Sequence, residues 1–149
     1  MKFEHNPRCF PLDSEAKMVD GKRVYATPDG EFYPSITTVI GNNAKKQAGL
    51  AKWRARVGKE KAAAISSRSA SRGTKFHSIT EDYLNNELDI KKYKDSPLPV
   101  VMFEQTKKTF DRIGNIYLQE AFLYSKHLEV AGRVDLIAEF DGDLSVIDF

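Results

Sequence analysis

Residues 130–149 read VAGRVDLIAEFDGDLSVIDF, and this stretch decides the fold. The segments 130–140 and 143–149 follow a period of two residues, which is typical of β-strands. Between them, Asp141-Gly142 is a dipeptide that a two-residue type I′ turn favours, because both turn positions need a positive φ. The pattern therefore predicts an antiparallel hairpin in which Phe140 pairs with Asp143.

This register sets two carboxylates against each other. Asp135 falls directly opposite Asp148, and a symmetric four-residue loop would give the same pairing; opposed β-carbons lie about 5 Å apart. Because opposed like charges destabilise a sheet, a divalent cation, a shared proton or an arginine must offset the repulsion. Oxygen ligands at this spacing suit Mg²⁺ or Mn²⁺. The alternative is a solvated hairpin end, at which Arg133 or a lysine neutralises the pair.

Two places upstream add candidate ligands. Glu120 interrupts an apolar row on a predicted strand, residues 116–124; there it needs a cation if it is buried, whereas a one-residue slip of register would expose it. His77 and Glu81 are four residues apart on a predicted helix and so share one face. Neutral imidazole is a metal ligand, which Glu81 could join or orient, although such a pair is also common on exposed surfaces.

The rest of the chain predicts helices between two β regions. After an irregular stretch, the sequence predicts strands at 22–27 and 31–33. It predicts helices at 36–40, 45–58, 59–72, 74–86 and 98–113. Gly73 and Gly114-Asn115 are predicted to end the helices that precede them. The expected fold class is α+β (mixed α/β). We expect a single domain made of a β arm (1–34), a helical part (35–114) and an antiparallel β-meander (115–149).

Charge is unevenly distributed along the 149 residues, although the net charge is only +2. Residues 45–75, the basic segment, hold ten Lys or Arg and one acid, a charge of +9. Such segregation favours an anionic partner, most commonly nucleic acid, and the plainer alternative is a solvated helical face. Trp53 shares a face with Leu50 and Val57, which predicts a place in the core rather than a base-stacking role. The candidate DNA-binding residues are Lys45, Lys52, Arg54, Arg56, Arg68, Arg72 and Lys75.

Several classes of protein are excluded or disfavoured. No apolar run is long enough to span a membrane. The only cysteine is Cys9, so there is no internal disulfide, no cysteine-rich zinc site and no cysteine-held iron–sulfur cluster. Residues 1–13 contain no apolar stretch of secretory type. We therefore expect a protein of the reducing cytoplasm, which is the host cytoplasm if the source is viral.

Three motifs resemble one nuclease family. Residues 72–77 (RGTKFH) with Glu81 resemble the R-G-T-x-x-H-x-x-x-E segment of RecB-type nucleases in the PD-(D/E)XK superfamily. Residues 132–137 (GRVDLI) are similar to that family's G-x-x-D strand, and residues 146–149 (VIDF) to the start of its (I/V)-D-x-K-T strand. Residues 33–40 and 50–58 further resemble a subgroup that contains phage exonucleases and the mitochondrial genome maintenance exonuclease.

The resemblance implies a restriction-endonuclease-like core and Mg²⁺- or Mn²⁺-dependent hydrolysis of phosphodiester bonds from a DNA end, in replication, recombination or repair. Asp135 and Asp148 would be metal ligands, His77 a ligand or a group that orients one, Glu120 the acid that precedes the G-x-x-D strand, and Glu81 a supporting residue. The family's lysine would fall two residues after Asp148, beyond Phe149. We therefore expect the C-terminal part of the fold to be missing and this chain to show little or no turnover. The alternatives are a non-catalytic nucleic-acid-binding module and a structural or partner-binding α+β domain.

Overall fold

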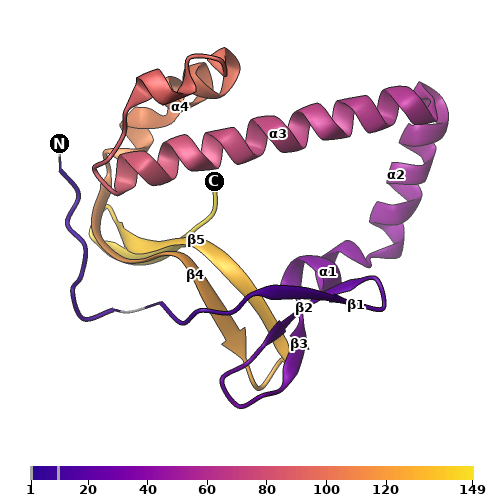
Figure 1. Ribbon diagram of the computed structural model, residues 1–149, viewed down its shortest axis with the longest axis horizontal. Coiled ribbons are helices and arrows are strands. Elements are labelled where there is room, and N and C mark those ends of the chain that lie inside the picture. Colours follow the sequence, from indigo (N-terminus) through magenta and orange to yellow (C-terminus); the bar gives the residue numbers. More distant parts are fainter. Residues whose placement is uncertain (1, 10) are drawn as a thin grey trace.

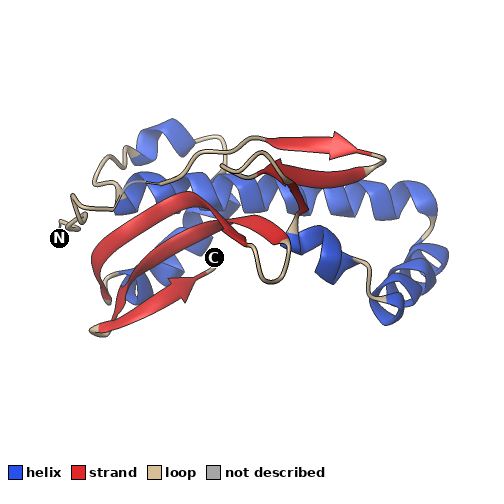
Figure 2. Ribbon diagram, turned by 90° about the horizontal axis from the view of Figure 1, so that it is seen from below, coloured by secondary structure: helices blue, strands red, loops and turns tan. Residues whose placement is uncertain are grey.

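The computed structural model, which describes residues 2–9 and 11–149, has the mixed α+β architecture that the sequence predicts (Figures 1 and 2). Its described part contains two antiparallel three-stranded sheets, ordered β1-β2-β3 and β4-β5-β6. The elements in chain order are β1 (Ala16–Val19), β2 (Lys22–Ala26), β3 (Phe32–Pro34), α1 (Ile36–Gly41), α2 (Ala44–Val57), α3 (Lys59–Leu84), the short 3₁₀ helix η1 (Ile90–Tyr93), α4 (Pro97–Phe110), β4 (Ile113–Ser125), β5 (Val130–Phe140) and β6 (Asp143–Ile147).

The C-terminal hairpin has the predicted register. Phe140 pairs with Asp143 and Leu136 with Ile147. The turn residues Asp141 and Gly142 have φ angles of 53° and 93°, as a type I′ turn requires. Strand β6 ends at Ile147, so Asp148 directly follows the last paired residue. The same register, extended by one residue, would place Asp148 opposite Asp135.

The main core lies between the β4-β5-β6 sheet and the layer formed by α4 and the second half of α3 (Figure 1). Ile79 of α3, Phe103 of α4 and Leu136 of β5 are all fully buried in it. Burial of side chains of this size contributes roughly 1.5–3 kcal/mol each. This packing fixes the second half of α3 against the sheet.

A second, smaller apolar cluster joins the N-terminal sheet to the hairpin formed by β4 and β5. Tyr25 of β2 and Tyr33 of β3 pack with Phe122 of β4 and Ala131 of β5. The stretch before residue 20 was expected to be irregular, but it contains β1, which pairs antiparallel with β2. All four side chains of β1 are exposed and show no burial pattern, so only the Asp20-Gly21 turn signals this strand.

One long helix replaces the two helices predicted on either side of Gly73. The 26 residues of α3 run through this glycine without a break. Glycine inside a helix costs about 1 kcal/mol relative to alanine, and the packing of Phe76 and Ile79 on the core outweighs that cost. The glycine signal was therefore overridden by tertiary contacts.

The substitution Gly73→Ala tests this continuity. A β-carbon at residue 73 would meet nothing within 4 Å. We therefore expect Ala to stabilise the protein by about 0.5–1 kcal/mol, the difference in helix propensity. The measurement is urea unfolding followed by circular dichroism. A loss of stability would show that the chain turns at Gly73, as the sequence alone suggested.

Two other predictions about the helical part are wrong. Helix α4 ends at Phe110, and Ile113 begins β4, where it pairs with Phe140. The chain turns at Asp111, whose carboxylate accepts a hydrogen bond from Tyr83 and ion-pairs with Lys107. Trp53 is half-buried rather than in the core, since none of the residues of α2 is buried.

Candidate metal centre

Three side chains from three elements meet where α3 crosses the sheet. His77 comes from α3, Glu120 from β4 and Asp135 from β5. Each offers one ligand atom, and these atoms lie within 4.8 Å of one another. The His77 Nδ1 atom is 3.5 Å from Asp135 Oδ2. We call these three residues the His–Glu–Asp cluster.

The Asp135 side chain is only 13% exposed. Its Oδ2 accepts a hydrogen bond of 2.9 Å from the backbone N–H of Phe149. Burial raises the pKa of Asp135 above its ordinary value of 3.8, and the carboxylate of Asp148 raises it further; the Phe149 amide and His77 act in the opposite direction. The protein therefore holds a carboxylate here that resists ionisation unless a cation joins it.

Glu120 reaches the cluster through an unusual backbone conformation. Its φ angle is 48°, which costs a non-glycine residue roughly 1–3 kcal/mol. The β4–β5 pairing has the same register before and after Glu120, so this residue is not an inserted bulge residue. Arg133 Nη1 donates a hydrogen bond of 2.7 Å to the carbonyl oxygen of Glu120. Burial raises the pKa of Glu120, as do the neighbouring carboxylates of Asp135 and Glu81, while His77 and Arg133 oppose the shift.

The positive φ also corrects the prediction of one continuous apolar face on β4. Ile116 lies in the main core, whereas Phe122 lies in the second cluster with the N-terminal sheet. Register shifts around Ile116 and the turn of the backbone at Glu120 interrupt the alternation. Strand periodicity alone does not reveal such interruptions.

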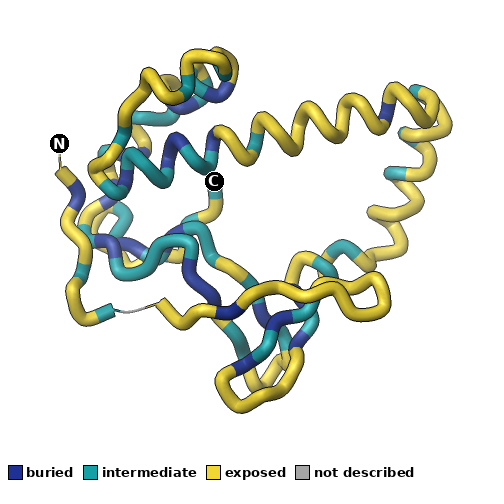
Figure 3. The backbone as a smooth tube through the Cα atoms, in the orientation of Figure 1, coloured by how far each residue is buried: buried dark blue, intermediate teal, exposed yellow. Residues whose placement is uncertain are grey.

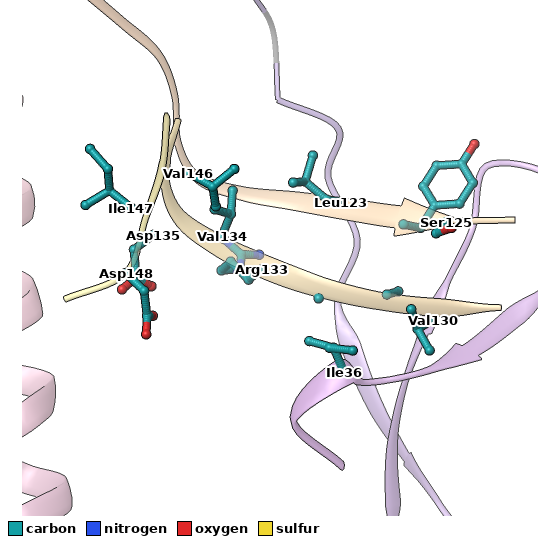
Figure 4. Close-up of a pocket in the computed structure, with 13 residues that line it drawn as sticks. Ile36, Leu123, Ser125, Val130, Arg133, Val134, Asp135, Val146, Ile147 and Asp148 are labelled. Carbon is teal, nitrogen blue, oxygen red and sulfur yellow. The ribbon is translucent and has the colours of Figure 1, made fainter. Parts of the chain in front are cut away.

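Glu81 and Asp148 flank the cluster without being among its three residues. Glu81 is half-buried, and its carboxylate is near enough to raise the pKa of Glu120. Asp148 is exposed and directly follows β6. Figure 4 shows its side chain next to that of Asp135, at one end of a hollow of about 390 Å³.

The same hollow extends from the two aspartates along an apolar wall (Figure 4). Ile36 of α1 and Val130 of β5 line its far part. A β-carbon at Gly132 would come within 2.9 Å of Ile36 Cγ2. The glycine of the GRVD segment is therefore the residue that lets α1 approach β5 closely.

Sequence reasoning missed one neighbour of the cluster. Gln119 donates a hydrogen bond of 3.1 Å from Nε2 to the carbonyl oxygen of Glu81, which ties β4 to α3 beside Glu120. Its Oε1 is buried without a hydrogen-bond partner in the described part of the chain. The only sequence signal was a second polar residue next to Glu120 on a strand.

The donor set defines the chemistry that the cluster supports. Two carboxylates and an imidazole bind divalent cations, and a cation would offset the burial and the neighbouring negative charges that raise the pKa of Glu120 and of Asp135. Carboxylates suit Mg²⁺ and Mn²⁺ alike, whereas an imidazole ligand is better tolerated by Mn²⁺. The residues present therefore fit a divalent cation.

The basic segment follows α2 and the first half of α3, away from the His–Glu–Asp cluster. Almost every residue there is exposed (Figure 3). All seven candidate DNA-binding residues are exposed. Lys75 and His77 are two positions apart on the helix, so they point about 200° apart around its axis. Arg68, Arg72 and Lys75 accordingly face α4 rather than the cluster.

Comparisons with known proteins give no family for this chain: no protein-family model and no curated protein matches it. Among the described residues, no helix is both long and apolar enough to cross a membrane.

Proposed function

We propose that this protein is a divalent-metal-dependent nuclease that hydrolyses phosphodiester bonds in DNA from a free end. The observation that carries the proposal is the meeting of His77, Glu120 and Asp135 within 4.8 Å. The resemblance of residues 72–81, 132–137 and 146–149 to RecB-type PD-(D/E)XK nucleases supports it, since two of these motifs supply His77 and Asp135. Work in DNA replication, recombination or repair would follow from that chemistry.

The proposed roles divide between ligands and supporting groups. Asp135 and Glu120 would hold the cation through carboxylate oxygens, His77 would bind it or orient Asp135, and Asp148 would add a further oxygen. A bound Mg²⁺ or Mn²⁺ supplies an activated water and neutralises charge on the phosphate. The Phe149 amide fixes the Asp135 carboxylate, and Arg133 fixes the backbone at Glu120.

DNA as the partner is supported by charge. The +9 of the basic segment is carried on exposed helices, where a phosphate backbone can reach it. Such binding weakens steeply with salt, because bound cations are released from the DNA. We further propose a reducing cytoplasm as its place of work, in keeping with Cys9, which is a free thiol.

A single-turnover assay tests the proposed reaction. Protein in excess is mixed with end-labelled DNA, single- or double-stranded, in Mn²⁺, Mg²⁺ or EDTA. We expect cleavage from the DNA end to require the metal, and Asp135→Asn should lower its rate by about 10²- to 10⁴-fold. Asp143→Asn, an exposed aspartate of the same hairpin, is the matched control and should leave the rate unchanged.

The alternatives predict different results. A non-catalytic nucleic-acid-binding module would bind DNA with salt sensitivity, but Asp135→Asn would alter neither metal binding nor cleavage. A structural or partner-binding domain would not bind DNA even at low salt. Cleavage that persists in Asp135→Asn would place the reaction elsewhere and contradict the proposal.

A further inference from the structure

A second hollow, of about 400 Å³, lies on the other flank of α3 from His77. One wall is the α3 face that carries Arg68, Arg72 and Lys75, and the other is the start of α4 at Ser96 and Pro99. The three basic residues are spaced by four and three positions, so they stand above one another on a single helical face. Three cationic side chains therefore line the same hollow.

Nothing in the described part of the chain neutralises these charges. None of the three residues takes part in an ion pair there. Asp95 directly precedes Ser96 of the hollow, but it is exposed and does not line the hollow. Like charges at helical spacing repel one another, so an anion held between them would be stabilised.

The donors around the hollow come from side chains rather than from the end of α4. Pro97 and Pro99 have no backbone N–H, so the first turn of α4 offers few amide donors. The hydroxyl of Ser96 makes no capping hydrogen bond to the helix, and Ser67 and Ser71 add two further hydroxyls from α3. The guanidinium groups of arginine and neighbouring hydroxyls can together donate several hydrogen bonds to the oxygens of one phosphate.

We infer that this hollow binds a backbone phosphate of the nucleic acid, at a position remote from the bond that is cleaved. The inference rests on the proposed function for its partner. Because Lys75 and His77 point about 200° apart, a phosphate held by Arg68, Arg72 and Lys75 is separated by the width of α3 from the His–Glu–Asp cluster. The hollow positions the substrate and takes no part in the chemistry.

The test is the salt dependence of DNA binding, measured in EDTA with a fluorescently labelled oligonucleotide. The double variant Arg68→Gln/Arg72→Gln should bind about tenfold more weakly, and its slope of log K against log salt should be smaller by about one unit. The matched control, Lys91→Gln/Lys108→Gln, removes the same charge from exposed positions outside the hollow and should keep the wild-type slope. Equal losses in the two double variants would overturn the inference, because they would reflect overall charge alone.

A second arm titrates inorganic phosphate and follows the amide NMR signals of Ser71, Lys75 and Ser96. Shifts that appear in the wild type and vanish in Arg68→Gln/Arg72→Gln support a phosphate site in the hollow. Phosphate binding with an unchanged DNA slope would assign the hollow to a free phosphate and overturn the nucleic-acid assignment. Since both arms omit the metal, their outcome does not depend on whether the cluster binds Mn²⁺ or cleaves DNA.

Discussion

Asp135→Asn is expected to weaken Mn²⁺ binding by at least about 100-fold. Groups that merely orient a ligand cost 10- to 100-fold in metal affinity when they are removed, and Asp135 would be a ligand itself. Asparagine keeps an oxygen that can accept the Phe149 N–H hydrogen bond but loses the charge. Isothermal titration calorimetry measures the affinity directly, and Mg²⁺ should bind the wild type more weakly than Mn²⁺.

Thermal unfolding gives an independent measure of the same site. At free Mn²⁺ about 100 times above Kd, binding to the folded state alone stabilises the wild type by roughly 2.7 kcal/mol. For a chain of this size that corresponds to a rise in Tm of about 5–10 °C. Asp135→Asn should show no rise, whereas the control Asp143→Asn should behave as the wild type. An equal rise in all three proteins would show that Mn²⁺ binds outside the cluster.

Without metal, the same substitution should make the fold more stable at neutral pH. Burial and Asp148 raise the pKa of Asp135 above 3.8, so the folded state holds its proton more tightly than the unfolded state does. The stability contributed by Asp135 therefore falls as pH rises through the window above 3.8, and stays low once the group is ionised. Asparagine resembles the protonated form, so Asp135→Asn should exceed the wild type in Tm at pH 7 in EDTA and converge with it in acid.

The hairpin that holds Asp135 could be predicted because its information is local. Asp141-Gly142 sets the turn, and the turn sets every pair that follows, including the approach of Asp135 to Asp148. The meeting of His77 with Asp135 depends instead on how α3 packs across the sheet. Motif resemblance predicted that contact, whereas helical spacing alone could not.

Other features were set by tertiary contacts that no short window contains. The continuous α3 passes Gly73 because distant core residues hold its second half, and the positive φ of Glu120 is stabilised by Arg133 from the neighbouring strand. The count of charges along the basic segment also carries no information on the direction of side chains around a helix. Two positions turn a side chain to the opposite flank, which separates Lys75 from His77.

Phe103→Ala is expected to cost about 3–5 kcal/mol, the largest loss of stability among these substitutions. Phe103 is 1% exposed in the main core. Its ring stacks on Phe110 at 6.1 Å between centroids and meets the ring of Tyr83 edge-on at 5.1 Å. Removing it opens a cavity between α3 and α4, and a cost of this size is a large fraction of the 5–15 kcal/mol typical of a folded protein.

Urea unfolding compares this variant with Phe103→Leu and with Val101→Ala. Leucine refills part of the cavity, so Phe103→Leu should remain folded and lose an intermediate amount even where the alanine variant does not fold. Val101 is on the same helix but 49% exposed, and its truncation should change stability by no more than about 0.5 kcal/mol. Because the packing of α3 against α4 and the sheet also sets the position of His77, Phe103→Leu should bind Mn²⁺ more weakly than Val101→Ala does. Equal stability in all three variants would mean that α4 does not hold α3 in place, and the geometry of the His–Glu–Asp cluster would then need another support.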